Sequence, residues 1–516
     1  MKKHSTVFLS GFVAIIAITL RAPSCYESFW LDELHSAWCA WDTLADVGGR
    51  ASAGHQTSIY FLGLWFWKLI FGESEFALRM SSVIAVSIAC GLLTFIISKS
   101  FRSHFAGITA GMILAIEENS LFFGTELRPY ALIILLSTIA VLCFLILLRE
   151  RNLNSKRRTW ILLLSTVLLA MIIQPTSVGV LAPLPLMLGI KRRFLHAEKN
   201  EHPRKRPTIY LLVAILTFLA VLTLKSSIIE SWQNRDLWIA FGKSNSFAQL
   251  MAAWNWKWLW LAPALIFSVL LMLNGWELSW QQHQITIQIA ITLASICVLT
   301  TLLYWLLAYP PVAPVWHRRY FIGLLPVFAC LGSIPIIFAQ QIQTNGKQRQ
   351  SIHQTFFSPG IWSGFLVIAL AWDQNLLHTL TDYPVAYARR GEKWREAVEH
   401  INQLASVEDT IWISPGLIEE KLMVQNLSVN LDQPNGRQPD SLTRLEEFLK
   451  YPVHGPYRLR FPVQLWKGKR ASQMGEPGRD ILLVRVPASR LHQSLKSTSE
   501  VTSFGGLCVL ILNKAE

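Results

Sequence analysis

Long apolar runs separated by short polar segments make up most of the chain. Runs of about 18 residues recur between Val7 and Trp372, and a helix of that length crosses the ~30 Å hydrocarbon core of a bilayer. From about Asp373 onward, the sequence returns to an ordinary mixture of polar and apolar residues. The pattern therefore predicts a mainly α, polytopic membrane domain at 1–373 and a small soluble domain at 374–516.

The apolar runs predict about eleven transmembrane helices. They fall at 6–22, 80–98, 105–118, 130–148, 159–173, 176–190, 208–224, 257–273, 285–308, 320–340 and 357–373. One further run, Ile59–Phe71, is short for a span and carries Trp65, Trp67 and Lys68. Aromatic and basic side chains favour the headgroup region, so we predict an interfacial helix at 58–71 inside an external loop at about 23–79.

The distribution of charge gives the orientation of these helices. Charged residues are only 16% of the chain, and its net charge is +14. Much of the basic excess lies in the short loops 149–158, 191–206 and 341–350, and short basic loops mark the cytoplasmic side. The N-terminus is then cytoplasmic and the C-terminal domain extracytoplasmic, at the cell (inner) membrane. Basic loops explain the charge, so nucleic-acid binding is not favoured.

Cysteines and the N-terminus add little to this picture. Seven cysteines are scattered without metal-type spacing; Cys25 and Cys39 both fall outside, and the sequence leaves open whether they pair. Lys2 and Lys3 precede the first apolar run, but no small-x-small cleavage site follows it, so we interpret this run as a retained span.

The C-terminal part alternates between helical and strand patterns. Helical periodicity occurs at Glu392–Leu404 and Asp440–Leu449, and short apolar runs typical of buried strands occur at Thr410–Ile413, Asp480–Val486 and Cys508–Leu512. Such alternation predicts a small α/β domain.

Two acidic groups follow predicted spans on the external side. Asp32 and Glu33 stand in the apolar run that follows the first span, and adjacent desolvated carboxylates raise each other's pKa, as a general base requires. Alternatively, Asp32 only caps a short helix. The second group contains Glu117, Glu118, Glu126, Arg128 and Tyr130. Its plain interpretation is that Glu126 pairs with Arg128 in water.

Basic residues also fall outside, against the positive-inside trend. Arg79 begins the span at 80–98, where an arginine is by default an interfacial anchor. The run His317, Arg318, Arg319 and Tyr320 follows a proline-rich loop, and phosphate binding would explain its position. A tolerated exception to the trend is the alternative.

Carboxylates and cations at headgroup height suit one particular chemistry. A carboxylate can deprotonate a hydroxyl or hold a divalent cation, and arginine can bind a phosphate and stabilise the charge that develops as it leaves. A lipid-linked phosphosugar needs both functions. Phosphate leaves as a stable anion, so one carboxylate suffices as base and the anomeric carbon inverts; glycoside hydrolysis, in contrast, needs a second carboxyl group.

The same residues resemble a known family. The run Phe29–Leu34 resembles the Asp-Glu signature in the first external loop of the GT-C glycosyltransferases, especially the protein O-mannosyltransferases and the lipid A aminoarabinose transferases. Other stretches fit the pattern in order: 55–72, 75–79, 126–132, Arg319-Tyr320 with Pro326, and 393–397. Each stretch is short, and their common order and topology carry the resemblance.

The resemblance implies an inverting glycosyltransferase that uses a polyprenyl-phosphate sugar donor outside the cytoplasm. Asp32 would be the base, with Glu33 and Glu126 positioning the acceptor or a divalent cation. Arg79, Arg318 or Arg319 would contact the donor phosphate. The remaining substrate-binding candidates are His55, Arg128, Tyr130, His317 and Tyr320.

Two departures from the family pattern leave metal use and the acceptor open. Gln56-Thr57-Ser58 follows His55 where relatives often have Pro-Pro, and Gln174-Pro175-Thr176 occupies a loop where relatives often have a histidine. The acceptor is then a protein, a lipid or a glycan, and the sugar is not specified.

Two alternatives belong to other classes of protein. A transporter or flippase of lipid-linked substrates would carry ionisable residues at mid-span, and the spans have almost none. A non-catalytic relative that serves as a scaffold would tolerate the replacement of Asp32 by asparagine.

Overall fold

The computed structural model of the chain describes residues 3–149, 153–188, 235–244, 246–253, 262–273, 280–310, 312–345, 358–376, 391–420, 440–466, 479–491 and 499–512. The chain divides into two compact units. The helical unit contains Met1–Pro23 and Ser82–Ala388, and the mixed unit contains Ser24–Ser81 and Arg389–Glu516. The external loop of the predicted membrane domain is therefore grouped with the C-terminal part.

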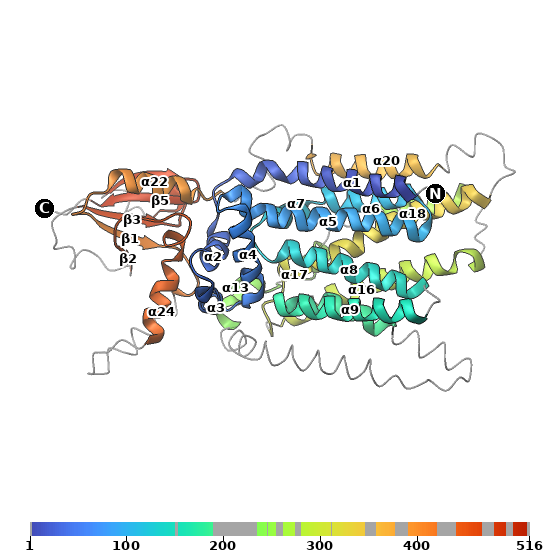
Figure 1. Cartoon of the computed structure of the whole chain (residues 1–516), viewed down its shortest axis with the longest axis horizontal. Helices are drawn as coiled ribbons and strands as arrows, with labels where there is room; N and C mark the ends of the chain where they lie inside the picture. Colours follow the sequence, from blue (N-terminus) through green and yellow to red (C-terminus); the bar gives the residue numbers. More distant parts are fainter. Residues whose placement is uncertain are drawn as a thin grey trace. The chain divides into compact units, whose positions relative to one another are not determined.

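Long helices that run side by side form the helical unit (Figure 1). Their order is α1 (Lys3–Arg21), α5 (Glu75–Phe101, which begins in the mixed unit), α6 (His104–Ile116), α7 (Glu118–Thr125), α8 (Tyr130–Arg149), α9 (Leu153–Ile173), η2 (Pro175–Ser177), α10 (Val178–Leu181), α13 (Arg235–Gly242), α14 (Phe247–Met251), α15 (Ala262–Leu273), α16 (Trp280–Ala308), α17 (Arg318–Phe321), η4 (Ile322–Leu324), α18 (Leu325–Asn345) and α20 (Pro359–Asp373).

Helix α18 lies at the centre of this unit. It packs against α6, α8, α15, α16 and α20, and the most apolar window of Arg318–Gln341 is wholly buried. A helix that is apolar on every side is typical of a protein core or of a membrane span. The outer helices α1 and α16 instead leave apolar side chains exposed, among them Phe8, Ile15, Ile291 and Leu303.

The predicted spans coincide with helices where the chain is described. Among the described residues, five helices are long and apolar enough to cross a membrane, and four shorter apolar ones accompany them at Ser58–Phe71, His104–Ile116, Pro175–Leu188 and Pro359–Asp373. The predicted span at 208–224 lies outside the described residues, as do parts of those at 176–190 and 257–273. The chain is a multi-pass membrane protein, and the number of crossings stays a prediction.

Glycines allow α5 and α6 to approach closely. A Cβ added at Gly107 would collide with the Ser98 side chain and the Thr94 carbonyl, and one added at Gly111 would lie 3.0 Å from the Cys90 carbonyl oxygen. Small residues four positions apart commonly provide such close contacts between membrane helices.

We expect Gly107→Ala to lower the thermal unfolding temperature of the detergent-solubilised protein by several degrees, since overpacking costs about 1–3 kcal/mol. The matched control is Gly11→Ala in α1, where an added Cβ would meet nothing within 4 Å. Equal melting temperatures for the two variants would contradict this account of the α5–α6 contact.

A five-stranded sheet forms the C-terminal part of the mixed unit (Figure 1). The strands are β1 (Thr410–Ser414), β2 (Val463–Leu465), β3 (Asp480–Val484), β4 (Ser499–Phe504) and β5 (Leu507–Leu512), in the order β2-β1-β3-β5-β4. β1 is parallel to β2 and β3, whereas β5 is antiparallel to β3 and β4. The accompanying helical elements are α22 (Trp394–Leu404), α24 (Asp440–Leu449), η6 (Tyr451–Val453) and η7 (Ala488–Arg490).

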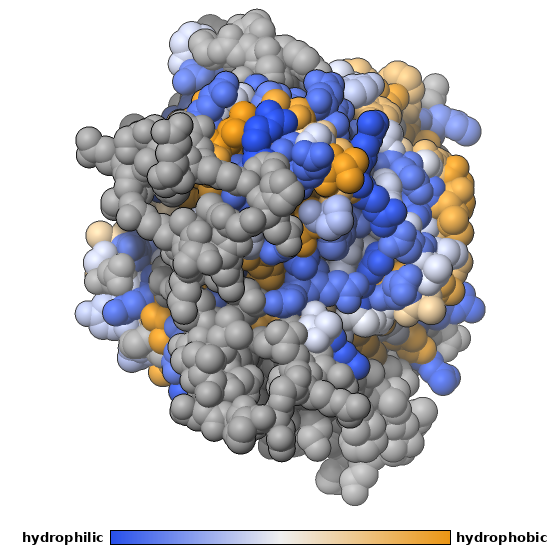
Figure 2. All heavy atoms as spheres, turned by 90° about the vertical axis from the view of Figure 1, so that its left-hand side faces the viewer, coloured by the Kyte–Doolittle hydropathy of each residue, from blue (hydrophilic) through white to orange (hydrophobic). Residues whose placement is uncertain are grey.

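This sheet confirms the predicted α/β character of the C-terminal part. The predicted strands at 410–413, 480–486 and 508–512 appear as β1, β3 and β5. β1 buries alternate side chains, among them Ile411 and Ile413, whereas β3 and β5 are buried along nearly their whole length. The sequence analysis missed β2, which is short, and β4, which is polar. Figure 2 looks onto the C-terminal strands, and the described residues on that face are mostly hydrophilic.

The remaining elements of the mixed unit come from the segment that follows the first span. They are η1 (Ala22–Tyr26), α2 (Leu31–Cys39), α3 (Leu44–Ala53) and α4 (Ser58–Phe71). Contacts between α2 and η6 and between α3 and α24 join them to the C-terminal part. Helix α4 has the predicted range 58–71 and exposes Phe66, Leu69, Ile70 and Phe71, and its place at the membrane interface stays a prediction. The sequence analysis did not predict α3, and it gave a helix near Asp32 only as an alternative.

An ion pair closes the turn before β1. Asp409 accepts hydrogen bonds from the backbone N–H groups of Ser406 (2.8 Å) and Arg479 (2.8 Å), and from Nη2 of Arg479 (3.0 Å). Partial burial alone would raise the pKa of Asp409, but the bonds from Arg479 and Ser406 outweigh it and hold the pKa well below its usual range. The charged carboxylate is therefore favoured in the folded state.

We expect Asp409→Asn to lower the unfolding free energy at pH 7 by about 1 kcal/mol. The folded pKa lies below the unfolded value of about 3.9, so the stabilisation is complete above that pH and is lost as the pH falls further. Thermal unfolding of wild type and variant should therefore converge below about pH 4. The exposed neighbour Glu408, replaced by glutamine, is the control, and a difference that grows in acid would contradict the assignment.

Candidate active site

The first candidate carboxylate, Asp32, lies in the first turn of α2. The next residue, Glu33, is 1% exposed, whereas Asp32 is half-buried and remains partly accessible. Successive helical side chains point about 100° apart, so the two carboxylates enter different surroundings. Glu33 turns back toward the helix start, where its Oε2 accepts a hydrogen bond from the backbone N–H of Trp30 (3.3 Å).

Glu33 forms a two-point ion pair with Arg79, which comes from the first turns of α5. Arg79 Nε donates to Glu33 Oε1 (2.8 Å) and Nη2 donates to Oε2 (2.5 Å). The side chains are 4% and 1% exposed, so this is a buried pair. The guanidinium also lies over the Phe29 ring, 4.8 Å from its centre.

The other N–H groups of Arg79 donate to backbone carbonyls of the preceding loop. Nη1 donates to Cys25 (3.2 Å) and Glu27, and Nη2 donates to Ser28 (3.1 Å). A guanidinium has five N–H donors, and all five have protein acceptors here. We expected Arg79 to contact the donor phosphate and Glu33 to position a substrate, but this geometry favours a structural role for both residues.

Residues of the C-terminal part hold the backbone just before Asp32. The backbone N–H of Phe29 donates to the Tyr457 hydroxyl (2.8 Å), and that of Leu31 donates to Glu392 Oε2 (3.0 Å). The Tyr451 hydroxyl donates to the Leu31 carbonyl (3.1 Å). Sequence reasoning missed these three side chains, because nothing local in the sequence marks partners that lie 361–428 positions away.

Tyr457 is itself anchored by a second acid. Its hydroxyl donates to Glu75 Oε1 (2.8 Å), which also accepts from Arg395 Nη1 (2.7 Å). Burial, together with the Glu75 charge, raises the pKa of Tyr457 well above its usual range, so the hydroxyl stays protonated and can donate. The peptide that leads into α2 is thus fixed by a continuous hydrogen-bond network.

His55 lies in the same unit, in the loop between α3 and α4. Its φ of 54° is in the left-handed region, which a residue other than glycine adopts at a cost unless its surroundings hold it. The ring is half-buried and interacts electrostatically with Glu419 of the C-terminal part, as Asp32 does. Asp32, His55 and Glu419 therefore share one neighbourhood.

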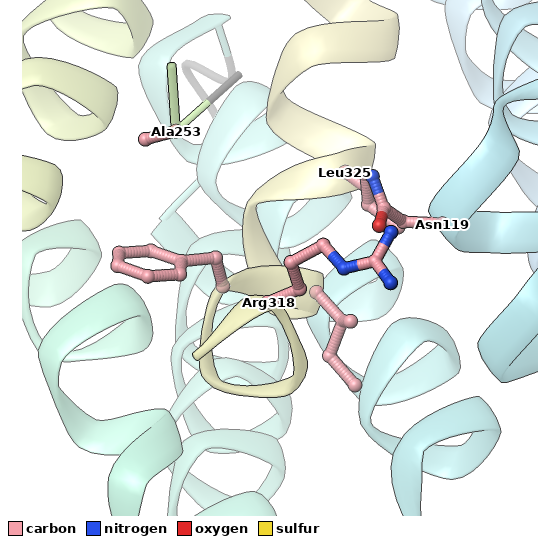
Figure 3. A pocket seen from close by; sticks show the side chains of 6 residues that line it. Asn119, Ala253, Arg318 and Leu325 are labelled. Carbon is pink, nitrogen blue, oxygen red and sulfur yellow. The ribbon is translucent and has the colours of Figure 1, made fainter. Parts of the chain in front are cut away.

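The second group of candidates lies in the helical unit, around Arg318 at the start of α17. Arg318 is 61% exposed on its side chain, and its Nη1 lies 3.7 Å from Glu118 Oε1. Together with Asn119 it lines a small pocket whose other lining residues are Ala253, Phe321, Ile322 and Leu325. In Figure 3 the guanidinium points toward the Asn119 amide. Such an arrangement offers N–H donors to an anion.

The neighbours of Arg318 support the turn that carries it. His317 Nδ1 accepts a hydrogen bond from the backbone N–H of Arg319 (3.3 Å) and caps α17. Arg319 Nη2 donates to the Tyr320 hydroxyl (3.1 Å), and its guanidinium lies over the Tyr320 ring. Of these candidates, Arg318 is the one whose exposed side chain faces the pocket.

The acidic loop of the helical unit is mostly buried. Glu126, Arg128 and Tyr130 are 1%, 7% and 5% exposed, so the predicted water-exposed Glu126–Arg128 pair does not describe this loop. The Ser82 hydroxyl donates to the Glu126 carbonyl (2.7 Å). Glu117 Oε1 accepts from the Asn119 amide (2.9 Å) and so orients that side chain in the pocket.

The candidates thus form two sets in different units. The mixed unit contains Asp32, Glu33, His55 and Arg79, and the helical unit contains Glu126, Arg128, Tyr130, His317, Arg318, Arg319 and Tyr320. The convergence of the two sets on one site stays a prediction. Within the described ranges, no three histidine, cysteine or acidic side chains are grouped so that they could hold a metal ion. Whether the protein uses a divalent cation stays open.

Comparisons with known proteins agree with the fold. Residues 57–225 match the family model described as dolichyl-phosphate-mannose-protein mannosyltransferase. The crystal structure of ArnT from Cupriavidus metallidurans bound to undecaprenyl phosphate is similar over 100% of this chain and 99% of that chain, with a TM-score of 0.52 and 12% identity. For the apo state of the same protein the coverage is 98% and 97%, the TM-score 0.48 and the identity 11%. No curated protein sequence matches the chain.

Proposed function

With the predicted likeness to GT-C glycosyltransferases confirmed by the family model and the fold, we propose that this protein is an inverting glycosyltransferase. It moves a sugar from a polyprenyl-phosphate donor to an acceptor hydroxyl at the extracytoplasmic face of the cell membrane. The single observation that carries this proposal is Asp32, a half-buried carboxylate whose preceding backbone is fixed by buried hydrogen bonds.

In this mechanism Asp32 is the general base. It takes the proton from the acceptor hydroxyl while the oxygen attacks the anomeric carbon, and the bond between that carbon and the phosphate oxygen breaks. The phosphate departs with the bonding electrons as a stable anion and requires no acid. Positioned general bases contribute about 10²–10⁴-fold to rate when their geometry is maintained.

Arg318 is our candidate for the residue that binds the donor phosphate. Its exposed guanidinium and the nearby Asn119 amide supply N–H donors, and arginine is suited to stabilising the charge that develops on a departing phosphate. The solved structure of similar fold contains undecaprenyl phosphate, which supports a donor of this class. Arg319, Tyr320 and His317 hold the turn, and Glu126, Arg128 and Tyr130 support the neighbouring loop.

The test uses the purified full-length chain in lipid nanodiscs with a panel of polyprenyl-phosphate sugars. A membrane fraction supplies acceptors, and the release of free polyprenyl phosphate reports transfer whatever the acceptor is. We expect at least one donor to be consumed. A chain that consumes none of them, yet moves a fluorescent lipid-linked sugar between leaflets, would instead be a flippase.

We expect Arg318→Ala to raise the KM for the donor about ten-fold or more, because a hydrogen bond to a charged group contributes about 1.5–3 kcal/mol. The matched control is Arg157→Ala, which removes an exposed arginine near the start of α9, in a segment predicted to be cytoplasmic. An unchanged donor KM in the Arg318 variant would remove this residue from the proposed phosphate site.

A further inference from the structure

The carboxyl ends of the parallel strands in the mixed unit meet at one edge of the sheet. β1 lies between β2 and β3, and all three run in the same direction. The chain leaves β1 toward β2 on one side and leaves β3 toward β5 and β4 on the other. In open α/β sheets, the crevice at such a reversal is the place where ligands bind.

The loop after β1 has a defined conformation at this edge. Gly416 adopts a φ of 65°, in the left-handed region that favours glycine, and its N–H donates to Glu420 Oε1 (2.8 Å). The N–H of Leu417 donates to the same oxygen (3.4 Å). Glu420 therefore closes the turn and fixes the position of its neighbour, Glu419.

The ends of β1 and β3 connect to the segment that carries Asp32. The N–H of Arg485, directly after β3, donates to the Ser414 carbonyl (3.0 Å), and its Nε donates to Glu392 Oε1 (2.7 Å). The second oxygen of Glu392 accepts from the N–H of Leu31 (3.0 Å). Short contacts thus link the strand ends to the residue before Asp32.

Glu419 is a buried carboxylate in the loop that follows β1 at this edge of the sheet. It is 7% exposed, and within the described part of the chain its Oε2 is fully buried without a hydrogen-bond partner. Burial raises its pKa, His55 opposes that rise, and the Asp32 charge adds to it. A buried carboxylate oxygen without a donor is costly, so a ligand that supplies a donor would relieve that cost.

We propose that Glu419 is a substrate-binding residue that accepts a hydrogen bond from a second hydroxyl of the acceptor, next to the hydroxyl that Asp32 deprotonates. The acceptor is then a polyol, such as a sugar residue with vicinal hydroxyls. This inference rests on the proposed function. Asp32 and Glu419 interact electrostatically, and two acidic side chains repel an anion, so this neighbourhood suits the acceptor and not the donor phosphate.

The functional test compares 1,2-propanediol with 1-propanol as small acceptors, using the full chain in nanodiscs and a donor that the wild type consumes. We expect the wild type to prefer the diol. Glu419→Ala should remove that preference, about ten-fold, by lowering transfer to the diol more than transfer to 1-propanol. Glu419→Gln, which keeps an acceptor oxygen, should retain part of the preference.

The matched control is Glu399→Ala, which removes an exposed glutamate from α22 of the same unit. A diol preference that survives Glu419→Ala would overturn the proposal. A wild type that prefers 1-amino-2-propanol to the diol would overturn the polyol class, because the second group would then be an amine.

A second measurement tests the placement without any activity. Cysteines introduced at His55 and Glu419 should be joined by a short bismaleimide, and mass spectrometry of the digested full chain should detect the linked peptides. Cysteines at His55 and Glu399 should not be joined. Absence of the first cross-link would overturn the placement, whereas a wild type that consumes no donor but forms the cross-link would overturn only the proposed function.

Discussion

Asp32→Asn should reduce sugar transfer about 10³-fold, within the range expected when a positioned general base is lost. Asparagine has nearly the same shape and keeps a hydrogen-bond acceptor, but it cannot take the proton of the acceptor hydroxyl. The donor KM should hardly change, since binding of the phosphate does not require this carboxylate. The measurement is the release of polyprenyl phosphate under single-turnover conditions in nanodiscs.

The matched control is Asp46→Asn, which changes a half-buried aspartate in the first turn of α3, close to α2 in the chain. Asp46 accepts bonds from Thr43, and asparagine can keep them, so this variant should retain activity. An Asp32→Asn protein that transfers sugar at the wild-type rate would exclude Asp32 as the base. A scaffold without catalysis would show no transfer in either protein.

Periodicity and charge made most of the fold predictable. The runs at 130–148 and 357–373 match α8 and α20 to within a few residues. Lipid offers no hydrogen-bond partners to the backbone, so an apolar stretch that crosses it forms a helix, and its length can be recognised in the sequence. The buried strands β1, β3 and β5 were recognisable for a similar reason. β2 and β4 were missed, since a three-residue strand and a polar edge strand carry little pattern.

The candidate site was predictable only in part. The sequence marks Asp32 and Glu33 as adjacent carboxylates, but it does not show that their surroundings differ. On the helix Asp32 stays partly accessible, whereas Glu33 is buried in an ion pair with Arg79. Arg79 was one of three candidates for the phosphate contact, because the sequence shows a cation near the membrane boundary and does not show the carbonyls of Cys25, Glu27 and Ser28 that surround it.

The role of the C-terminal part depends on contacts that no local pattern records. Glu392 directly precedes the stretch 393–397, and nothing in that stretch indicates that its carboxylate joins Arg485 to the Leu31 N–H. Tyr451 and Tyr457 hold the same peptide from other directions. We infer that this part supports the candidate site, because it fixes the start of the helix that carries the proposed base.

The structural role of the Glu33–Arg79 pair gives the second large effect. Arg79→Met should destabilise the mixed unit by about 3–5 kcal/mol, the usual result of leaving one partner of a buried pair uncompensated. It would also leave three backbone carbonyls without their donor, so the loss should lie at the upper end of that range. Thermal unfolding and limited proteolysis of the full chain would measure it.

The buried Glu33–Arg79 pair can be compared with a pair in which the acidic partner is exposed. Lys68 and Glu73 lie 3.4 Å apart with Glu73 56% exposed, so Glu73→Ala should change stability by less than about 1 kcal/mol. The double variant Glu33→Leu, Arg79→Met should recover part of the loss, because no charge is then left unpaired, but not all of it, because the carbonyls of Cys25, Glu27 and Ser28 still lack donors. If Arg79 instead bound the donor, Arg79→Met would raise the donor KM in a chain of unchanged stability.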